Sequence, residues 1–166
     1  MKYLFHGSNT GNISVLKPHI SLEFKSLVYA TSDWKYALVR AGKQLDLIRE
    51  EYYGPDKPFE LAECYPGAFK QMFDCPGYIY LLADDDFIRN ENGEYVSEKE
   101  VIPLGCVRID NIWSEMMRLK GYWDYEFVWD GDEEYWKGVR GGREGFLKRK
   151  RANKQKMLEL RKEFEA

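Results

Sequence analysis

The sequence contains few of the residues on which metal sites and disulfide frameworks depend. It has only 3 cysteines and 2 histidines in 166 residues. Cys64, Cys75 and Cys106 are scattered and odd in number, and no pair of them has the spacing of zinc ligands. We therefore predict no metal site, and we interpret the cysteines as reduced thiols of a cytoplasmic protein.

Long hydrophobic runs are also absent. No apolar stretch approaches the ~20 residues that a membrane-spanning helix needs, and the N-terminus lacks the basic-then-apolar pattern of a signal peptide. We therefore expect a cytoplasmic protein without membrane contacts. The formal net charge is only -3, so overall charge argues neither for nor against a nucleic-acid partner.

What the chain does contain is typical of a globular domain. It is 44% hydrophobic, 16% aromatic and 32% charged, and its length suffices for a single domain with a proper core. The composition changes after Gly141 and Gly142, so we predict a domain over 1–141 followed by a charged helix over 142–166. The basic segment 148–156 of that helix could contact RNA or DNA, although a solvated helix explains the same charges.

Strands and one long helix are predicted in the first half of the chain. β-rich apolar stretches predict strands at 3–7 and 26–31. The helix is predicted to begin after Ser32 or Asp33 and to end at Gly54-Pro55, because apolar residues then recur at helical spacing: Trp34, Ala37, Leu38, Ala41, Leu45, Ile48 and Tyr52. The stretch 54–76, rich in Pro, Gly and aromatics, is predicted to be an ordered loop that can include a short helix.

The second half is predicted to be richer in strands. The elements expected there are strands at 77–83, 94–97, 101–109 (interrupted at Pro103) and 124–129, a turn at Asn92-Gly93, and a helix at 110–121. Strands with one long helix after the second strand favour an α+β fold over a doubly wound α/β fold.

Three short stretches contain residues suited to chemistry on a ligand. In "FHGS", a strand places His6 beside Gly7, where a ligand can approach the main chain closely. In "VYATSD", Tyr29 offers a flat face to a heteroaromatic ring. In "NGEYVS", the carboxylate of Glu94 enters a strand after a turn and can stabilise positive charge on a sugar. Each stretch alone is better explained structurally, by a hydrogen-bonded histidine, a packed tyrosine and a solvated glutamate.

Together, and in this order, the three stretches resemble the ADP-ribosyltransferase fold. The resemblance is to the branch shared by diphtheria-type toxins and poly(ADP-ribose) polymerases, which carries a His-Tyr-Glu set. Its motifs match His6-Gly7-Ser8, Tyr29-Ala30-Thr31 and Glu94-Tyr95-Val96, and the resemblance covers roughly residues 3–109. It implies split, mostly antiparallel sheets around an NAD cleft, here followed by a C-terminal helical extension.

The resemblance also implies a role for each matching residue. His6 would bind a ribose hydroxyl of NAD, the Gly7 backbone would hold the nicotinamide carboxamide, and Ser8 would support that pocket. Tyr29 would stack on the nicotinamide ring, and Glu94 would stabilise the oxocarbenium-like transition state. The family often has a second aromatic residue on the following helix, for which Tyr36 is the candidate, although Trp34 competes for that role.

The identity of the catalytic glutamate is left open by the sequence. The stretch "EKEVIP" is similar to the paired-glutamate turn of arginine-modifying toxins, which would make Glu100 catalytic and Glu98 its substrate-facing partner. Those toxins carry Arg where this chain has His6, so Glu94 is the preferred catalytic residue.

The resemblance therefore predicts an NAD-dependent ADP-ribosyltransferase, a glycosyltransferase that uses NAD as a substrate and needs no metal. Its acceptor would be an unknown protein or nucleic-acid group. Two alternatives remain on the same fold. One is an enzyme similar to RNA 2'-phosphotransferases, whose additional arginines and second histidine we cannot place in this sequence. The other is a non-catalytic module that binds a nucleotide or nucleic acid.

Overall fold

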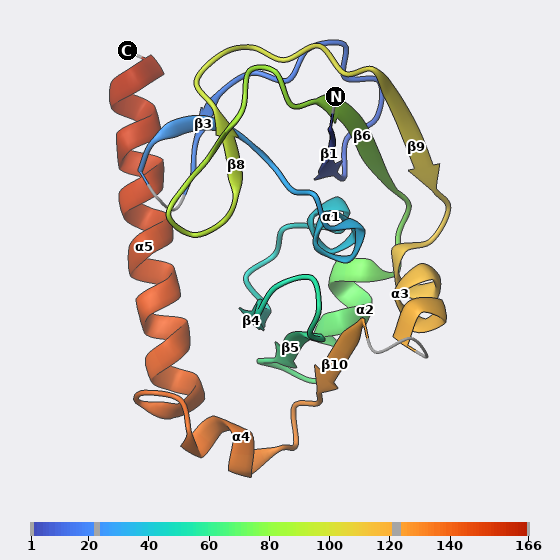
Figure 1. The fold of residues 1–166 in the computed structure, drawn as a ribbon. Helices are drawn as coiled ribbons and strands as arrows, with labels where there is room; N and C mark the ends of the chain where they lie inside the picture. The colour runs from blue at the N-terminus through green and yellow to red at the C-terminus, as the bar shows by residue number, and fades with distance from the viewer. Residues whose placement is uncertain (1, 22–23, 121–123, 166) are drawn as a thin grey trace.

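The computed structural model describes residues 2–21, 24–120 and 124–165, and it has an α+β architecture. Two antiparallel sheets lie in the upper part of the molecule (Figure 1). The first has the order β1-β6-β9 and consists of β1 (Tyr3–Ser8), β6 (Gly77–Ala83) and β9 (Gly105–Ile109). The second has the order β2-β3-β8-β7 and consists of β2 (His19–Ile20), β3 (Ser26–Ala30), β8 (Tyr95–Ser97) and β7 (Ile88–Arg89).

Main-chain hydrogen bonds join the two upper sheets at Phe5 and Thr31. The Phe5 N–H donates to the Thr31 carbonyl at 2.7 Å, and the Thr31 N–H donates to the Phe5 carbonyl at 2.9 Å. This bridge is isolated, so regular pairing does not continue along β1 and β3. β1 and β3 therefore run unpaired with each other beyond this point, and side chains from both can face the space between them.

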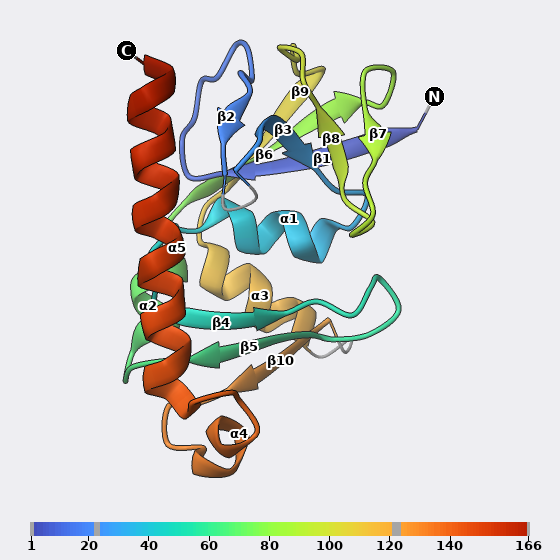
Figure 2. The same cartoon turned by 90° about the vertical axis from the view of Figure 1, so that its left-hand side faces the viewer.

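A third sheet forms the lower part of the molecule. It has the order β10-β5-β4, in which β5 (Phe59–Glu63) pairs antiparallel with β4 (Ile48–Glu51) and parallel with β10 (Tyr125–Val128). Helix α1 (Trp34–Ala41) lies between the upper sheets and this lower sheet, as Figures 1 and 2 show.

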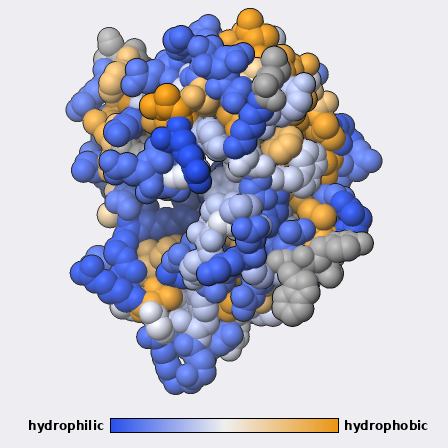
Figure 3. All heavy atoms as spheres, in the orientation of Figure 1, coloured by the Kyte–Doolittle hydropathy of each residue, from blue (hydrophilic) through white to orange (hydrophobic). Residues whose placement is uncertain are grey.

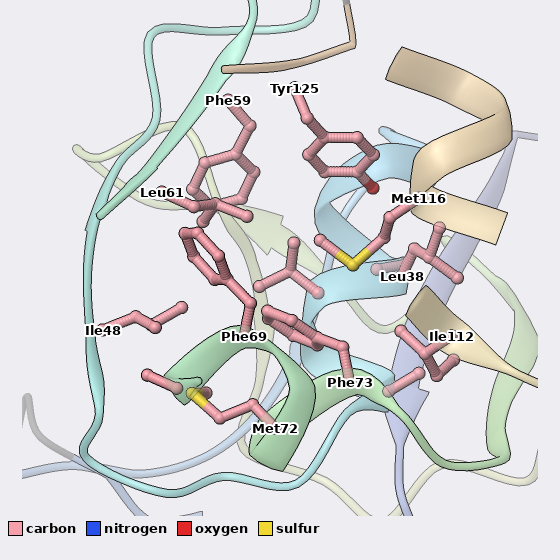
Figure 4. Packing of buried hydrophobic residues seen from close by; sticks show 14 of the residues in the cluster. Leu38, Ile48, Phe59, Leu61, Phe69, Met72, Phe73, Ile112, Met116 and Tyr125 are labelled. Carbon is pink, nitrogen blue, oxygen red and sulfur yellow. The ribbon is translucent and has the colours of Figure 1, made fainter. Parts of the chain in front are cut away.

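The main hydrophobic core lies against α1. Large side chains from α1, the lower sheet, α2 (Ala68–Phe73) and α3 (Ile112–Lys120) interlock there (Figure 4). Leu38, Phe59, Phe69, Phe73 and Ile112 are fully buried. Burying each such side chain contributes about 1.5–3 kcal/mol, so α1 is a rigid platform for residues on its opposite side.

The sequence prediction of one long helix up to Gly54 is wrong. α1 ends at Ala41, and the amide nitrogen of Gln44 donates to the carbonyls of Arg40 and Gly42 at the helix end. Gly42 also packs so closely that an added Cβ would lie 2.6 Å from the Phe73 ring. Leu45, Ile48 and Tyr52 fit helical spacing by coincidence, since Ile48 begins strand β4.

The stretch predicted to be an ordered loop contains more regular structure than expected. Residues 59–63 form β5, although the short helix expected there is confirmed as α2. The strand predicted at 101–109 is interrupted as expected and resumes as β9 at Gly105, while Val101 forms a separate bridge with Leu16. The turn at Asn92-Gly93 is also confirmed, with Gly93 at a φ of 79°.

Helix α5 (Gly142–Glu165) follows the short helix α4 (Glu133–Lys137) and runs along one side of the molecule, from α4 to the level of β2 (Figure 2). Its first turns are anchored by Leu147, which is buried in a small cluster with Cys64 and Trp136. Further along, the Arg161 guanidinium donates to the Ile20 carbonyl at 2.9 Å. The helix is therefore attached to both ends of the molecule.

Three further predictions concern the state of the cysteines, metal ligands and membrane-spanning helices. All three cysteines are free thiols, with Cys64 and Cys75 buried and Cys106 exposed. Within residues 2–21, 24–120 and 124–165, no group of three or more His, Cys, Asp or Glu side chains could hold a metal ion. In the same part of the chain, no helix combines the length and apolar character needed to cross a bilayer.

Candidate functional site

A cavity of about 780 Å³ lies where the two upper sheets diverge above α1. Its volume is within the ~300–1,000 Å³ typical of small-molecule sites. Figure 3 shows the surface hollowed on the α5 side of the molecule, with hydrophilic residues around the opening. Six residues expected from the sequence line this cavity: His6, Gly7, Ser8, Tyr29, Tyr36 and Glu94.

The His6 imidazole is fixed by the neighbouring strand. Its Nδ1 lies 2.7 Å from the Tyr29 carbonyl oxygen. A carbonyl can only accept, so Nδ1 carries the proton and Nε2 of the neutral ring keeps a free lone pair. Burial lowers the pKa of His6 below its ordinary value, against the opposing effect of this hydrogen bond. His6 is therefore a neutral acceptor, suited to a ligand hydroxyl.

The packing of β1 on α1 requires a glycine at position 7, independently of any ligand. A Cβ at this position would lie 1.9 Å from the Ala37 carbonyl oxygen and 2.8 Å from the Ala41 nitrogen, both in α1. Because Phe5 bonds to Thr31, the alternation of an antiparallel ladder turns the Gly7 N–H and C=O away from β6, toward the side of β3. Main-chain polar groups therefore face the region of the cavity.

Tyr29 and Glu94 lie on the same face of the second sheet. Tyr29 in β3 is paired directly with Val96 in β8, and directly paired residues share a face. Glu94 is two residues before Val96, so its side chain is on that face too. The Tyr29 hydroxyl lies 2.7 Å from the Ser21 Oγ, which fixes the ring at the cavity wall.

Glu94 is held by the turn that precedes β8. The Asn90 side chain accepts from the Glu94 N–H at 2.9 Å and donates to the Glu94 Oε2 at 3.2 Å. The turn also contains Gly93, whose N–H donates to the Asn90 carbonyl. The carboxylate thus has a fixed position, as a group that stabilises developing charge requires.

Tyr36 reaches Glu94 from the opposite wall of the cavity. Its hydroxyl donates to the Glu94 Oε1 at 3.2 Å and accepts from Arg40 at 3.3 Å. Burial raises the pKa of Tyr36 above its ordinary value, despite the lowering effect of Arg40, so the hydroxyl remains a donor. Arg40 is in turn paired with Glu50 of β4 at 2.5 Å.

The alternative catalytic pair lies elsewhere. Glu98 and Glu100 are exposed and are not among the residues that line the cavity. His19 of β2 is exposed and also lines the cavity.

Several site residues were missed by the sequence analysis. Asn90 had a detectable signal, since Asn at the start of a turn commonly bonds to the backbone a few residues later. Arg40 follows Tyr36 by four residues and so shares its helix face, but its bond to Glu50 depends on the lower sheet. Arg40 and Lys43 also line the cavity; Glu50 balances the charge of Arg40, whereas Lys43 can offer positive charge to an anionic ligand.

Comparison with known proteins adds no identification: no family model, no curated protein and no solved structure matches this chain.

Proposed function

We propose that this protein is an NAD-dependent ADP-ribosyltransferase, with an ADP-ribosyltransferase-like fold around the cavity. One observation carries the proposal. Residues from three separate stretches, chosen from the sequence for three complementary tasks, line a single cavity of about 780 Å³. The divergence of β1 and β3 from the isolated Phe5–Thr31 pair supports the expected split between the sheets.

NAD would be bound by groups that complement its nicotinamide riboside half. The free lone pair of His6 Nε2 accepts a ribose hydroxyl, and the main-chain groups of Gly7 bind the carboxamide. The Tyr29 ring packs against the nicotinamide ring, and Ser8 supports this pocket. Lys43 provides positive charge that favours the pyrophosphate.

The reaction would break one C–N bond and form one bond to the acceptor. As the ribose C1'–N bond lengthens, its electron pair leaves with nicotinamide and positive charge develops on the sugar. The fixed Glu94 carboxylate stabilises that charge. The acceptor nucleophile then attacks C1' and loses its proton. Orientation and electrostatic stabilisation are therefore the main tasks of the protein.

The test is nicotinamide release from NAD by the purified protein, with wild type beside Glu94→Gln. Removing one such electrostatic contact commonly lowers turnover by about 10²–10³-fold. Glu100→Gln is the matched control because it changes the same group at an exposed position outside the cavity. Loss in Glu100→Gln alone would reassign the catalytic glutamate. No release by wild type, together with no NAD binding in calorimetry, would leave only the non-catalytic alternative.

One observation favours a nucleic-acid acceptor over a protein acceptor. The segment 148–156 of α5 contains six Lys and Arg residues and no acid, whereas the whole chain has a net charge of -3. Lys148, Arg149 and Arg151 are exposed, while Lys150 and Lys154 face Asp46. Contacts to phosphates would make binding fall steeply with salt. Replacing Lys148 and Arg151 by Gln should reduce that slope without removing the buried anchor of α5, and an unchanged slope would exclude this surface.

A further inference from the structure

The ring of Tyr36 is occupied by contacts with the protein itself. Phe59 stacks on it with a centroid distance of 5.4 Å and an interplanar angle of 20°, and Tyr52 packs edge-on at 4.8 Å. The Arg40 guanidinium lies 5.0 Å from the ring centroid. The family's second aromatic residue, for which Tyr36 is the candidate, would pack on the other face of nicotinamide, but these contacts tie the ring to the core and direct its hydroxyl into the cavity.

The hydroxyl is the part of Tyr36 that contacts the candidate catalytic group. Its oxygen accepts from Arg40, which leaves its proton free to be donated to Glu94. Arg40 is held in turn by two hydrogen bonds to Glu50, with NH1–Oε1 at 3.3 Å and NH2–Oε2 at 2.5 Å. A two-point contact between a guanidinium and a carboxylate fixes direction as well as distance.

A continuous chain of contacts therefore runs from the lower sheet to the cavity. It begins at Glu50 in β4, passes through Arg40 and Tyr36 on consecutive turns of α1, and ends at Glu94 before β8. Burial opposes the charge on Arg40, yet Glu50 and Tyr36 together outweigh this effect and raise the pKa of Arg40, so the link stays charged. Without these contacts, Asn90 of the preceding turn would still hold Glu94 through its side chain.

We infer that Tyr36 is a positioning residue, whose hydroxyl, held by the Arg40–Glu50 pair, fixes the Glu94 carboxylate for the transition state rather than binding nicotinamide. This inference rests on the proposed function. It deepens that function by assigning one oxygen of Glu94 to Tyr36 and the other to Asn90. The carboxylate is then held at both oxygens, which restricts rotation of the carboxylate group about the bond that joins it to the rest of the side chain.

The test compares Tyr36→Phe with wild type in nicotinamide release. The substitution keeps the ring and its packing on Phe59 but removes the hydroxyl. Because a hydrogen bond to a charged group is lost, we expect kcat to fall about tenfold to a hundredfold while KM for NAD changes by less than about twofold. A stacking role predicts instead that Tyr36→Phe behaves like wild type and that only loss of the ring raises KM.

Tyr52→Phe is the matched control. Tyr52 belongs to the same aromatic group, but its hydroxyl donates to Asp33, the N-cap of α1, and it does not line the cavity. Removing the Tyr52 hydroxyl should leave kcat and KM unchanged. Glu50→Gln weakens the Arg40 contact from outside the cavity and should lower kcat in the same direction as Tyr36→Phe, by a smaller factor.

A double-mutant cycle separates positioning from general damage. If Tyr36 acts through Glu94, adding Tyr36→Phe to Glu94→Gln should lower the residual rate by less than about twofold. Multiplicative losses in the double variant, or wild-type kcat in Tyr36→Phe, would overturn the inference while leaving the proposed function intact. Absence of nicotinamide release by wild type would overturn both. Full activity in Glu94→Gln would overturn the inference, and it would overturn the proposed function too if Glu100→Gln were also fully active.

Discussion

At the residue scale, Gly7 shows how one position can satisfy two requirements. Its missing Cβ allows α1 to cross β1, and its main-chain groups face the region of the cavity. Gly7→Ala would place a methyl group 1.9 Å from a main-chain oxygen, so β1 and α1 must separate. We expect a loss of roughly 1–3 kcal/mol in the free energy of unfolding, measured by chemical denaturation.

Gly105→Ala is the control for that measurement. Nothing lies within 4 Å of a Cβ built at Gly105 in β9. The free energy of unfolding of Gly105→Ala should therefore equal that of wild type. Equal stability of Gly7→Ala and wild type would contradict the close packing of β1 on α1.

His6 gives the protein a specific response to acid. Its pKa in the folded state is lowered from the ordinary value of 6.5, chiefly by burial. Between that lowered pKa and 6.5 the unfolded chain binds more protons than the folded one, so stability is full above pH 6.5 and declines as pH falls below it. The further the pKa of the folded state lies below that of the unfolded state, the larger this loss of stability becomes.

The measurement is the free energy of unfolding against pH, with His6→Gln as the comparison. The variant should show a shallower decline below pH 6.5, and an NMR titration of His6 should give a pKa below 6.5. A His6 that titrates above 6.5 would contradict its burial as a neutral ring.

At the element scale, the sequence predicts an element well where a single pattern decides its structure. The strands at 3–7, 26–31 and 77–83 are uninterrupted β-rich runs, and β1, β3 and β6 confirm them. The error at α1 arose because apolar residues of the next strand continued the helical spacing by chance. Strand β4 reads Ile-Arg-Glu-Glu, and such a polar segment becomes a strand only because β5 pairs with it.

The candidate site was predictable to a similar extent. His6, Tyr29 and Glu94 were found because their order resembles a known family, and each alone was unremarkable. The contacts that hold them come from other elements, since Arg40 and Glu50 meet only after α1 packs on the lower sheet. Local sequence patterns do not encode contacts between elements that are far apart in the chain. The series of contacts from Glu50 through Arg40 and Tyr36 to Glu94 was therefore not predicted.

Helix α5 offers a prediction at this scale. Lys150 and Lys154 pair with Asp46 at 3.8 and 2.7 Å, and all three side chains are partly exposed. Exposed pairs contribute about 0–1 kcal/mol and are screened by salt. Asp46→Asn should therefore lower stability by at most ~1 kcal/mol in dilute buffer, and by less in concentrated salt. Asp110→Asn, which removes a more exposed pair with Arg108, should have no measurable effect.

At the scale of the whole molecule, the cavity is built from parts that are far apart in the chain. Its wall combines β1, β3, α1 and the residue before β8. A ligand that contacts all of them binds the folded state alone, so saturating NAD should raise the midpoint of thermal unfolding. At 100 times its Kd, a ligand adds about 2.7 kcal/mol, and for a chain of this size each kcal/mol corresponds to roughly 2–4 °C.

Tyr29→Ala should reduce that stabilisation, because it removes a ring at the cavity wall while leaving the main-chain pairing of β3 with β8 in place. Tyr3→Ala, at an exposed position outside the cavity, is the control and should respond to NAD as wild type does. An equal shift in both variants would place the NAD site elsewhere.

The isolated pairing of Phe5 with Thr31 has a consequence for observing the molecule. These two amides join the upper sheets at the point where β1 and β3 diverge, and both residues line the cavity. Any separation of the cavity walls at this point must break both hydrogen bonds and expose both amide protons to solvent. Hydrogen exchange at Phe5 and Thr31 is therefore a direct gauge of cavity opening, and it reads that motion in the resting protein, without substrate or turnover.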